Sequence, residues 1–220
     1  MKGLIQGPGF PFVAPFALFM GLLYVRQNFP EQSWWLYGAC SLVVLGLILW
    51  LRPRYRGQDP SPPQILSSAL LGLGAIVLWI GLDPWMPRTG GPRDNTFPFE
   101  AAFQIGTVPG VLAILFRIFG AVLVVPIVEE LFWRGFLMRT IIKPEFEEVP
   151  LGTFQPLSFY ITTVAFALVH VEFGSAILFG LIAGWWFCRT KSLRAVIVLH
   201  AAANLGLAVY VLITRNWFLW

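Results

Sequence analysis

The feature that most constrains this chain is a series of seven apolar runs with little polar sequence between them. The runs cover roughly residues 10–25, 33–51, 65–82, 108–142, 155–172, 175–189 and 195–214. A helix needs about 20 apolar residues to cross a hydrocarbon core that is about 30 Å thick. The sequence therefore predicts an all-α polytopic membrane bundle with seven to eight transmembrane helices.

The composition supports a membrane protein and excludes several other classes. Of the 220 residues, 57% are hydrophobic and only 12% are charged, against roughly 25% charged in an ordinary soluble domain. Too few polar residues are present to cover a water-facing surface. A soluble enzyme, a disordered regulator and a disulfide-stapled secreted domain are therefore excluded, and we expect residues 1–220 to form a single integral-membrane domain.

The fourth run is too long for one simple span. Its 35 residues would reach about 50 Å as a straight helix, and Pro126 lies inside it. Proline removes a backbone N–H and clashes with the preceding turn, so we expect a kink or a break at this position. Seven traverses are predicted, with eight helices as the alternative.

Basic residues in short loops predict the orientation. They lie in residues 52–56, at Arg139 and Lys143, and in residues 189–194, and an alternating count of spans places all of them on one side. The positive-inside rule makes that side cytoplasmic. The loop 83–107 is then expected outside. The net charge of +4 follows from this topology, and no nucleic-acid partner is predicted.

The most informative residues are polar groups at membrane depth. A charged side chain at a bilayer centre costs at least about 2.5–3.5 kcal/mol, so such residues face the bundle interior and mark functional sites. The chain has a set of them, and its two histidines are both members: Glu129, Glu130, Arg134, His170, His200 and Asn204.

Helical spacing predicts which of these groups share a face. Glu130 and Arg134 are four residues apart and are expected to pair, whereas Glu129 points about 100° away and is free for other work. The same spacing places the Phe166 ring beside the His170 imidazole. Counting about 1.5 Å per residue from the cytoplasmic side, these groups converge on a band in the inner to middle membrane.

A carboxylate and two histidines in a dry pocket suit hydrolysis of a peptide bond. A glutamate serves as general base on a water molecule, which a histidine holds or relieves of a proton. A His–Asn pair donates hydrogen bonds to a developing oxyanion. Neither HExxH nor GxSxG occurs in the chain, so no serine or cysteine has the context of a nucleophile.

At these residues the chain resembles the CPBP family, the CAAX-protease and bacteriocin-processing membrane proteins also called Abi. The family pattern is EExxxR, then FxxxH, then HxxxN or HxxxD. The chain reads Glu129-Glu130-Leu-Phe-Trp-Arg134, then Phe166-Ala-Leu-Val-His170, then His200-Ala-Ala-Ala-Asn204. The resemblance covers about residues 108–214 and implies a catalytic core there, preceded by variable spans in residues 1–107.

The resemblance implies a glutamic-type intramembrane endopeptidase that uses no cofactor and no metal. Glu129 would be the catalytic base, and His170 would help to activate water. His200 and Asn204 would form the oxyanion site, with Glu130, Arg134 and Phe166 in support. It also implies a membrane-associated protein substrate, in some relatives prenylated, and a multi-pass protein of the prokaryotic inner (plasma) membrane.

Other interpretations remain open at this point. Glu129, His170 and His200 are an acceptable ligand set for zinc, which would make the chain a zinc-dependent hydrolase. The same pocket could belong to a non-catalytic immunity or substrate-binding protein, or to a small proton-coupled transporter. Glu129 could also be purely structural and pair with Arg117 or Arg134.

Overall fold

The computed structural model describes residues 7–29, 33–52, 59–89 and 108–219. Every regular element in this part of the chain is helical. The α-helices are α2 (Phe10–Arg26), α3 (Ser33–Leu51), α4 (Pro62–Leu82), α6 (Val108–Ile118), α7 (Val125–Glu130), α8 (Met138–Ile142), α9 (Pro156–Leu168), α10 (Phe173–Thr190) and α11 (Leu193–Thr214). Short 3₁₀ turns lie at η1 (Asp83–Trp85), η4 (Phe146–Glu148) and η5 (Trp217–Leu219).

All seven predicted apolar runs are helical, which confirms the fold class. Four helical segments are long and apolar enough to cross a membrane: Pro62–Trp85, Val108–Ile142, Phe173–Thr190 and Leu193–Thr214. Three other apolar helical stretches lie at Phe10–Arg26, Trp35–Leu51 and Pro156–Leu168. The chain is therefore an integral membrane protein, and the count of seven to eight traverses stays a prediction.

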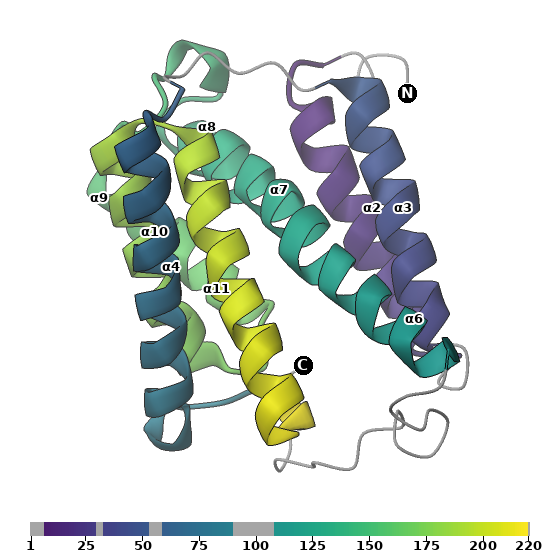
Figure 1. Ribbon diagram of the computed structural model, residues 1–220. Coiled ribbons are helices and arrows are strands. Elements are labelled where there is room, and N and C mark those ends of the chain that lie inside the picture. Colours follow the sequence, from purple (N-terminus) through teal and green to yellow (C-terminus); the bar gives the residue numbers. More distant parts are fainter. Residues whose placement is uncertain (1–6, 30–32, 53–58, 90–107, 220) are drawn as a thin grey trace.

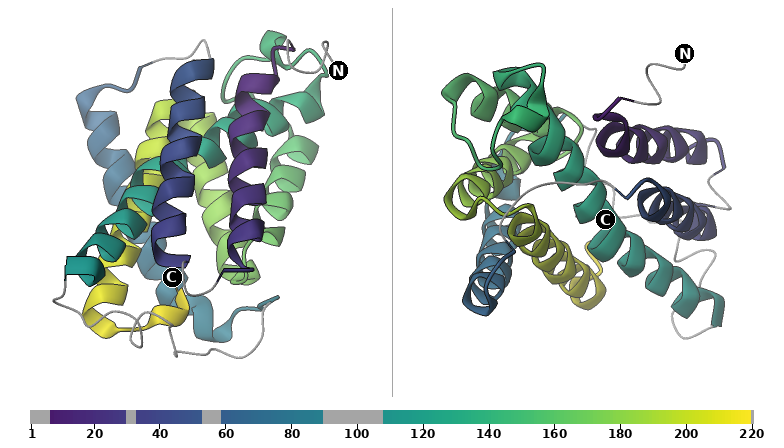
Figure 2. Two further views of the ribbon diagram at one scale, coloured as in Figure 1. Left: turned by 90° about the vertical axis from the view of Figure 1, so that its right-hand side faces the viewer. Right: turned by 90° about the horizontal axis from the view of Figure 1, so that it is seen from above.

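One long helix organises the bundle. It runs from Val108 to Ile142 and crosses the molecule obliquely (Figure 1). Helices α2 and α3 pack on one side of it, and α4, α9, α10 and α11 lie on the other, as the view from above shows (Figure 2). Residues of the long helix are thus held between two groups of helices, and its central part is the interior of the molecule.

The expected break at Pro126 does not occur. The long helix contains two π-helical stretches, η2 (Phe119–Val124) and η3 (Leu131–Leu137), on either side of α7. The N–H of Val125 bonds to the carbonyl of Gly120, five residues back. Pro126 therefore lies in the first turn of α7, where the hydrogen-bond ladder changes register and a missing N–H is tolerated. The helix continues without interruption through the site.

Close helix contacts at glycine fix the neighbours of the long helix. A Cβ atom on Gly72 of α4 would lie 2.1 Å from the carbonyl oxygen of Leu199 in α11, so only glycine lets these two backbones approach so closely. A Cβ atom on Gly120 would lie 2.4 Å from the Tyr37 ring in α3. These contacts press α11 against α4 and α3 against the long helix.

The predicted basic clusters lie at one end of the bundle. Arg139 and Lys143 end the long helix there, and Arg194 forms an ion pair with Asp59 at the start of the α4 segment. Residues 53–58 of the predicted basic loop lie outside the described residues. So do residues 90–107 of the predicted outer loop, which begins at the opposite end.

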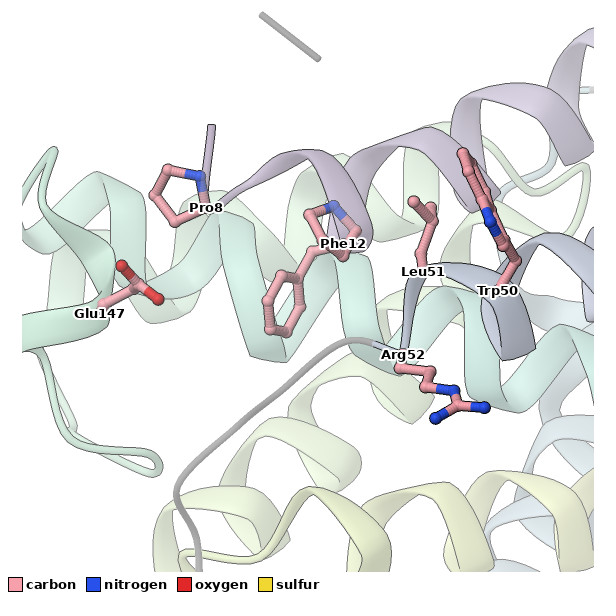
Figure 3. A pocket seen from close by; sticks show the side chains of 7 residues that line it. Pro8, Phe12, Trp50, Leu51, Arg52 and Glu147 are labelled. Carbon is pink, nitrogen blue, oxygen red and sulfur yellow. The ribbon is translucent and has the colours of Figure 1, made fainter. Parts of the chain in front are cut away.

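A pocket of about 410 Å³ opens at the basic end, between the start of α2, the end of α3 and η4 (Figure 3). Its lining residues are Pro8, Pro11, Phe12, Trp50, Leu51, Arg52 and Glu147. None of them is a predicted site residue. The motif residues therefore have to be described from their own contacts, deeper in the bundle.

Candidate active site

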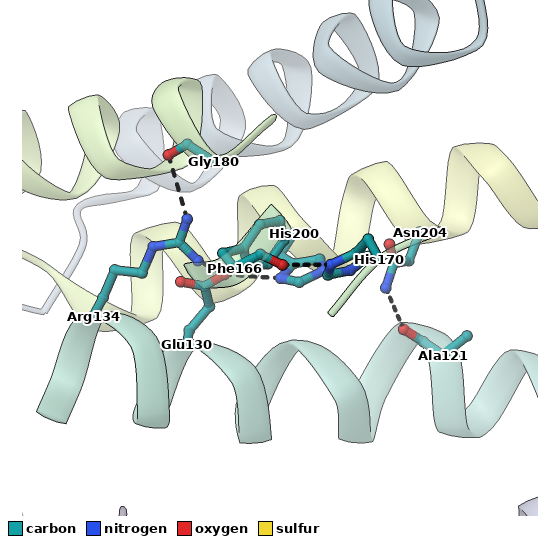
Figure 4. A network of polar contacts seen from close by, with 8 residues as sticks. All are labelled: Ala121, Glu130, Arg134, Phe166, His170, Gly180, His200 and Asn204. Carbon is teal, nitrogen blue, oxygen red and sulfur yellow. Dashed lines mark hydrogen bonds and ion pairs between the residues drawn. The ribbon is translucent and has the colours of Figure 1, made fainter. Parts of the chain in front are cut away.

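The centre of the candidate site is a buried three-residue network. Glu130 Oε1 accepts a hydrogen bond from Arg134 Nη1 at 2.9 Å and lies 2.8 Å from His200 Nδ1 (Figure 4). The first contact confirms the pairing predicted from the i,i+4 spacing. The second joins the long helix to α11 across 70 residues of sequence, and helical spacing alone could not have predicted it.

Because the three side chains of this network are buried, each depends on the others for its hydrogen bonds and for charge balance. The exposed fractions are 0% for Glu130, 1% for Arg134 and 4% for His200. A charge that is removed from water is tolerated only when it is paired and hydrogen-bonded. Arg134 meets this requirement with Glu130, and it also donates to the carbonyl oxygen of Gly180 at 3.4 Å. Its guanidinium carbon lies 5.0 Å from the centre of the Phe166 ring, a cation–π distance.

Glu129 lies in the same turn but has different surroundings. Its residue is 7% exposed, and its Oε2 has no hydrogen-bond partner among the described residues. Glu130, His200 and Arg134 all act on this carboxyl electrostatically. Arg134 bonds to Glu130 and not to Glu129, and the Arg117 guanidinium carbon lies 4.4 Å from the centre of the Tyr37 ring. Among the described residues, the ion pair of Arg134 is thus with Glu130 and not with Glu129, and the pairing of Glu129 with Arg117 stays a hypothesis.

His170 lies just beyond a helix rather than inside one, which corrects the expectation from the sequence. Helix α9 ends at Leu168, because the segment turns there to begin α10. The predicted ring contact is present, with the Phe166 and His170 centroids 4.4 Å apart. His170 Nδ1 lies 2.7 Å from the Phe166 carbonyl oxygen. Since a carbonyl only accepts, Nδ1 carries the proton and the neutral ring has its lone pair on Nε2.

Aromatic rings enclose both histidines. Trp79 of α4 lies edge-on to His170, with centroids 6.1 Å apart. Phe179 of α10 lies 4.9 Å from His200, and Phe166 lies 6.3 Å from His200. These rings come from three elements and provide an apolar wall, in which polar contacts are stronger than in water.

Asn204 lies one turn after His200 and faces the same long helix. Its Nδ2 donates to the carbonyl oxygen of Ala121 in η2 at 2.7 Å (Figure 4). An amide nitrogen has two hydrogens, so one remains for another acceptor. His200 Nδ1 donates to the Glu130 carboxylate, which leaves its Nε2 as the ring nitrogen without an assigned bond.

The structure thus brings the predicted residues together in two sets. Glu130, Arg134, His200, Phe166 and His170 form one continuous group of contacts. Asn204 joins the long helix separately through Ala121. Among the described residues, no three His, Cys, Asp or Glu side chains are arranged as a metal-ligand group.

These features define a class: a polytopic membrane protein with a buried Glu–Arg–His network beside a second carboxyl group, whose Oε2 has no hydrogen-bond partner among the described residues. Residues 111–206 match the family described as type II CAAX prenyl endopeptidase Rce1-like. This match confirms the resemblance to the CPBP and CAAX-protease family, and it covers all three motifs. The Rce1-like family implies a protease, and so a hydrolase acting in the membrane. No curated protein and no solved structure matches the chain.

Proposed function

We propose that the protein is an intramembrane endopeptidase that hydrolyses a peptide bond in a membrane-associated protein, with water activated by Glu129. The observation that carries the proposal is the difference between two adjacent carboxyl groups. Glu130 Oε1 accepts from Arg134 and lies beside His200 Nδ1, although its Oε2 has no hydrogen-bond partner. Among the described residues, Glu129 forms neither of these ion pairs, and its Oε2 is also buried without a partner. A buried carboxyl group without the ion pairs of its neighbour is costly, and a catalytic role is one reason for which such a group is kept.

In this mechanism Glu129 takes a proton from a water molecule while oxygen attacks the carbonyl carbon of the substrate. His170 Nε2 accepts the second hydrogen of that water and so orients it. The carbonyl oxygen becomes an oxyanion and receives the free amide hydrogen of Asn204. Glu129 then passes its proton to the departing amine as the C–N bond breaks, which completes hydrolysis and restores the carboxylate.

His200 supports the same oxyanion in its doubly protonated form. Its Nδ1 proton bonds to Glu130, so Nε2 donates only when it also has a proton. The Glu130 carboxylate stabilises that cation and holds the ring in place, as a carboxylate does for a catalytic histidine. Arg134 balances the charge of Glu130 when His200 is neutral. In this proposal Glu130 and Arg134 are positioning residues for His200.

The substrate proposed is a membrane-associated protein or peptide, lipidated or not. The aromatic wall around the histidines suits a substrate that enters from the apolar phase. The proposed location is a prokaryotic plasma membrane, with the basic end of the bundle in the cytoplasm. A binding or immunity role without hydrolysis is the main competing function, and it requires no unpaired carboxyl group.

The test compares protein termini in membranes from cells that contain the wild-type protein or Glu129→Gln at equal expression. Terminus-specific mass spectrometry is expected to find new termini only in the wild type, and these termini identify the substrate. A Glu145→Gln strain at matched expression is the control, because Glu145 is an exposed glutamate outside the site, and it is expected to give the wild-type termini. If termini are identical in the wild type and Glu129→Gln across growth conditions, the proposed activity is wrong.

We also propose that catalysis needs no metal, in contrast to the zinc alternative. Purified protein is expected to cleave the identified substrate at an unchanged rate after treatment with 1,10-phenanthroline, because Glu129 and the histidines act on water directly. Elemental analysis of the same active sample is expected to find no stoichiometric zinc. Loss of activity with the chelator and recovery with zinc would establish the metal-dependent mechanism instead.

A further inference from the structure

The turn that carries His170 is held by contacts from outside its own helices. Residues 169–172 connect α9 and α10, so helical hydrogen bonds do not fix the His170 backbone beyond its N–H, which bonds to Ala167 O at 3.0 Å. The side chain has one further bond, from Nδ1 to Phe166 O. The position of the turn therefore depends on what packs against it.

The segment after α4 packs against this turn through its backbone. The N–H of Thr89 bonds to Val171 O at 3.0 Å, and the N–H of Gly174 bonds to Pro87 O at 2.8 Å. The Thr89 hydroxyl donates to the carbonyl oxygen of His170 itself at 3.2 Å. A Cβ atom on Gly174 would lie 2.7 Å from Met86 Cβ, so the two segments are in direct contact.

Arg88 connects the same segment to the turn through charge. Its Nη2 lies 3.1 Å from Glu172 Oε1, and its Nη1 lies 3.5 Å from Asp83 Oδ2. The exposed fractions of the side chains are 15% for Arg88, 15% for Glu172 and 3% for Asp83. Ion pairs that are this well shielded are screened less by salt than surface pairs. Arg88 therefore links the end of α4 to a residue only two positions from His170.

We propose that Arg88 is a positioning residue, whose ion pair with Glu172 holds the 169–172 turn against the end of α4 and so sets the location of the free Nε2 of His170. Thr89 assists through its bond to His170 O. This inference rests on the role proposed above for His170. Arg88 and Thr89 lie outside the Rce1-like match at residues 111–206, so the site extends beyond the family motifs.

The test reads His170 directly. The chain has two histidines, so ¹⁵N-histidine NMR of the full chain in nanodiscs gives two sets of ring signals, which a His200→Gln sample assigns. Wild-type His170 is expected to show the Nδ1-protonated tautomer. Arg88→Gln and Thr89→Val are expected to lose this single tautomer pattern, whereas Arg88→Lys and Thr89→Ser retain it because they keep the charge or the hydroxyl.

Controls separate positioning from folding. Arg194→Gln removes an arginine from an exposed ion pair with Asp59 at the opposite end of the bundle, and it should leave the His170 signals unchanged. The double variant Arg88→Gln/Glu172→Gln should perturb His170 no more than either single variant. If Arg88→Gln lowers the melting temperature but leaves the His170 signals as in the wild type, Arg88 is only a stabilising residue and the inference is overturned.

Activity provides an independent reading. The yield of Glu129-dependent termini is expected to fall roughly tenfold to hundredfold in Arg88→Gln, as for a misplaced catalytic group, and to recover in Arg88→Lys. If the His170 signals change but the yield of termini does not, Arg88 positions the turn as inferred and the catalytic role of His170 is wrong. The two proposals therefore fail in different ways.

Discussion

Glu129 and Glu130 are neighbours in the chain, yet the bundle gives them opposite surroundings. Glu130 is bonded to a cation and to an imidazole, so its charge has a structural use. Among the described residues, Glu129 forms no such ion pair, and its Oε2 is buried without a hydrogen-bond partner. This contrast predicts that the two residues respond differently to the same substitution.

Removing the charge of Glu130 should destabilise the protein. In Glu130→Gln the buried Arg134 loses its partner, and an uncompensated buried charge costs about 3–5 kcal/mol. For a chain of this size this lowers the melting temperature by about 10 °C. Glu129→Gln should leave it unchanged or raise it, because an unpaired carboxyl is replaced by a neutral amide. Thermal unfolding in detergent measures both, and an equal fall in the two variants would contradict the contrast.

At the scale of helices, the site depends on how closely α4 and α11 approach. The carbonyl of Leu199, which is adjacent to His200, lies where a side chain on Gly72 would begin. A backbone oxygen cannot rotate away as a side chain does. The contact between α4 and α11 thus sets the distance between His200 and the long helix, on which Glu130 contacts the His200 ring.

Gly72→Ala should therefore weaken the bundle. The new methyl group forces α4 away from α11, and such overpacking typically costs about 1–3 kcal/mol. Gly74→Ala is a matched control in the same helix, because nothing lies within 4 Å of its Cβ position and alanine favours helix. The melting temperature should fall by several degrees only in Gly72→Ala. Equal values for both variants would show that the close contact is not important.

The sequence predicted the elements better than it predicted their ends and contacts. Apolar runs predicted every α-helix of the described residues, because hydrophobicity decides which segments leave water. The apolar run 155–172 predicted that His170 lies inside a helix, because nothing in Phe166-Ala-Leu-Val-His170 marks the turn after Leu168. Pro126 suggested a break, but the helix continues through a π-helical stretch, Phe119–Val124, directly before α7, and local sequence does not reveal this change of register.

The sequence analysis named the residues of the candidate site, but it did not predict the hydrogen bonds that join them across distant segments. The i,i+4 pair of Glu130 and Arg134 follows from helix geometry and is present. The bonds from His200 to Glu130 and from Asn204 to Ala121 join distant segments, and no spacing rule gives them. Arg88 was overlooked because it lies in an irregular segment without a motif. The only signal for it was a charged residue close to the end of an apolar run.

For the whole molecule, the sequence predicts the orientation of the bundle in the membrane. The basic end should face the cytoplasm, as the positive-inside rule predicts. In a chain with Cys40→Ala and Cys188→Ala, a cysteine replacing exposed Glu145 should react with an impermeant maleimide only from the cytoplasmic side. One replacing Trp85, which is 85% exposed at the other end, should react only from outside. The reverse labelling would invert the proposed topology.

Proteolysis by Glu129-activated water is the central claim, and purified protein tests it most directly. Wild type and Glu129→Gln would be compared in nanodiscs on a peptide copied from the cleaved segment of the identified substrate, with the melting temperature of each sample recorded. The account predicts that Glu129→Gln is at least as stable as the wild type and about 100-fold or more slower, the loss expected for a general base. A folded Glu129→Gln protein that cleaves at the wild-type rate would contradict it.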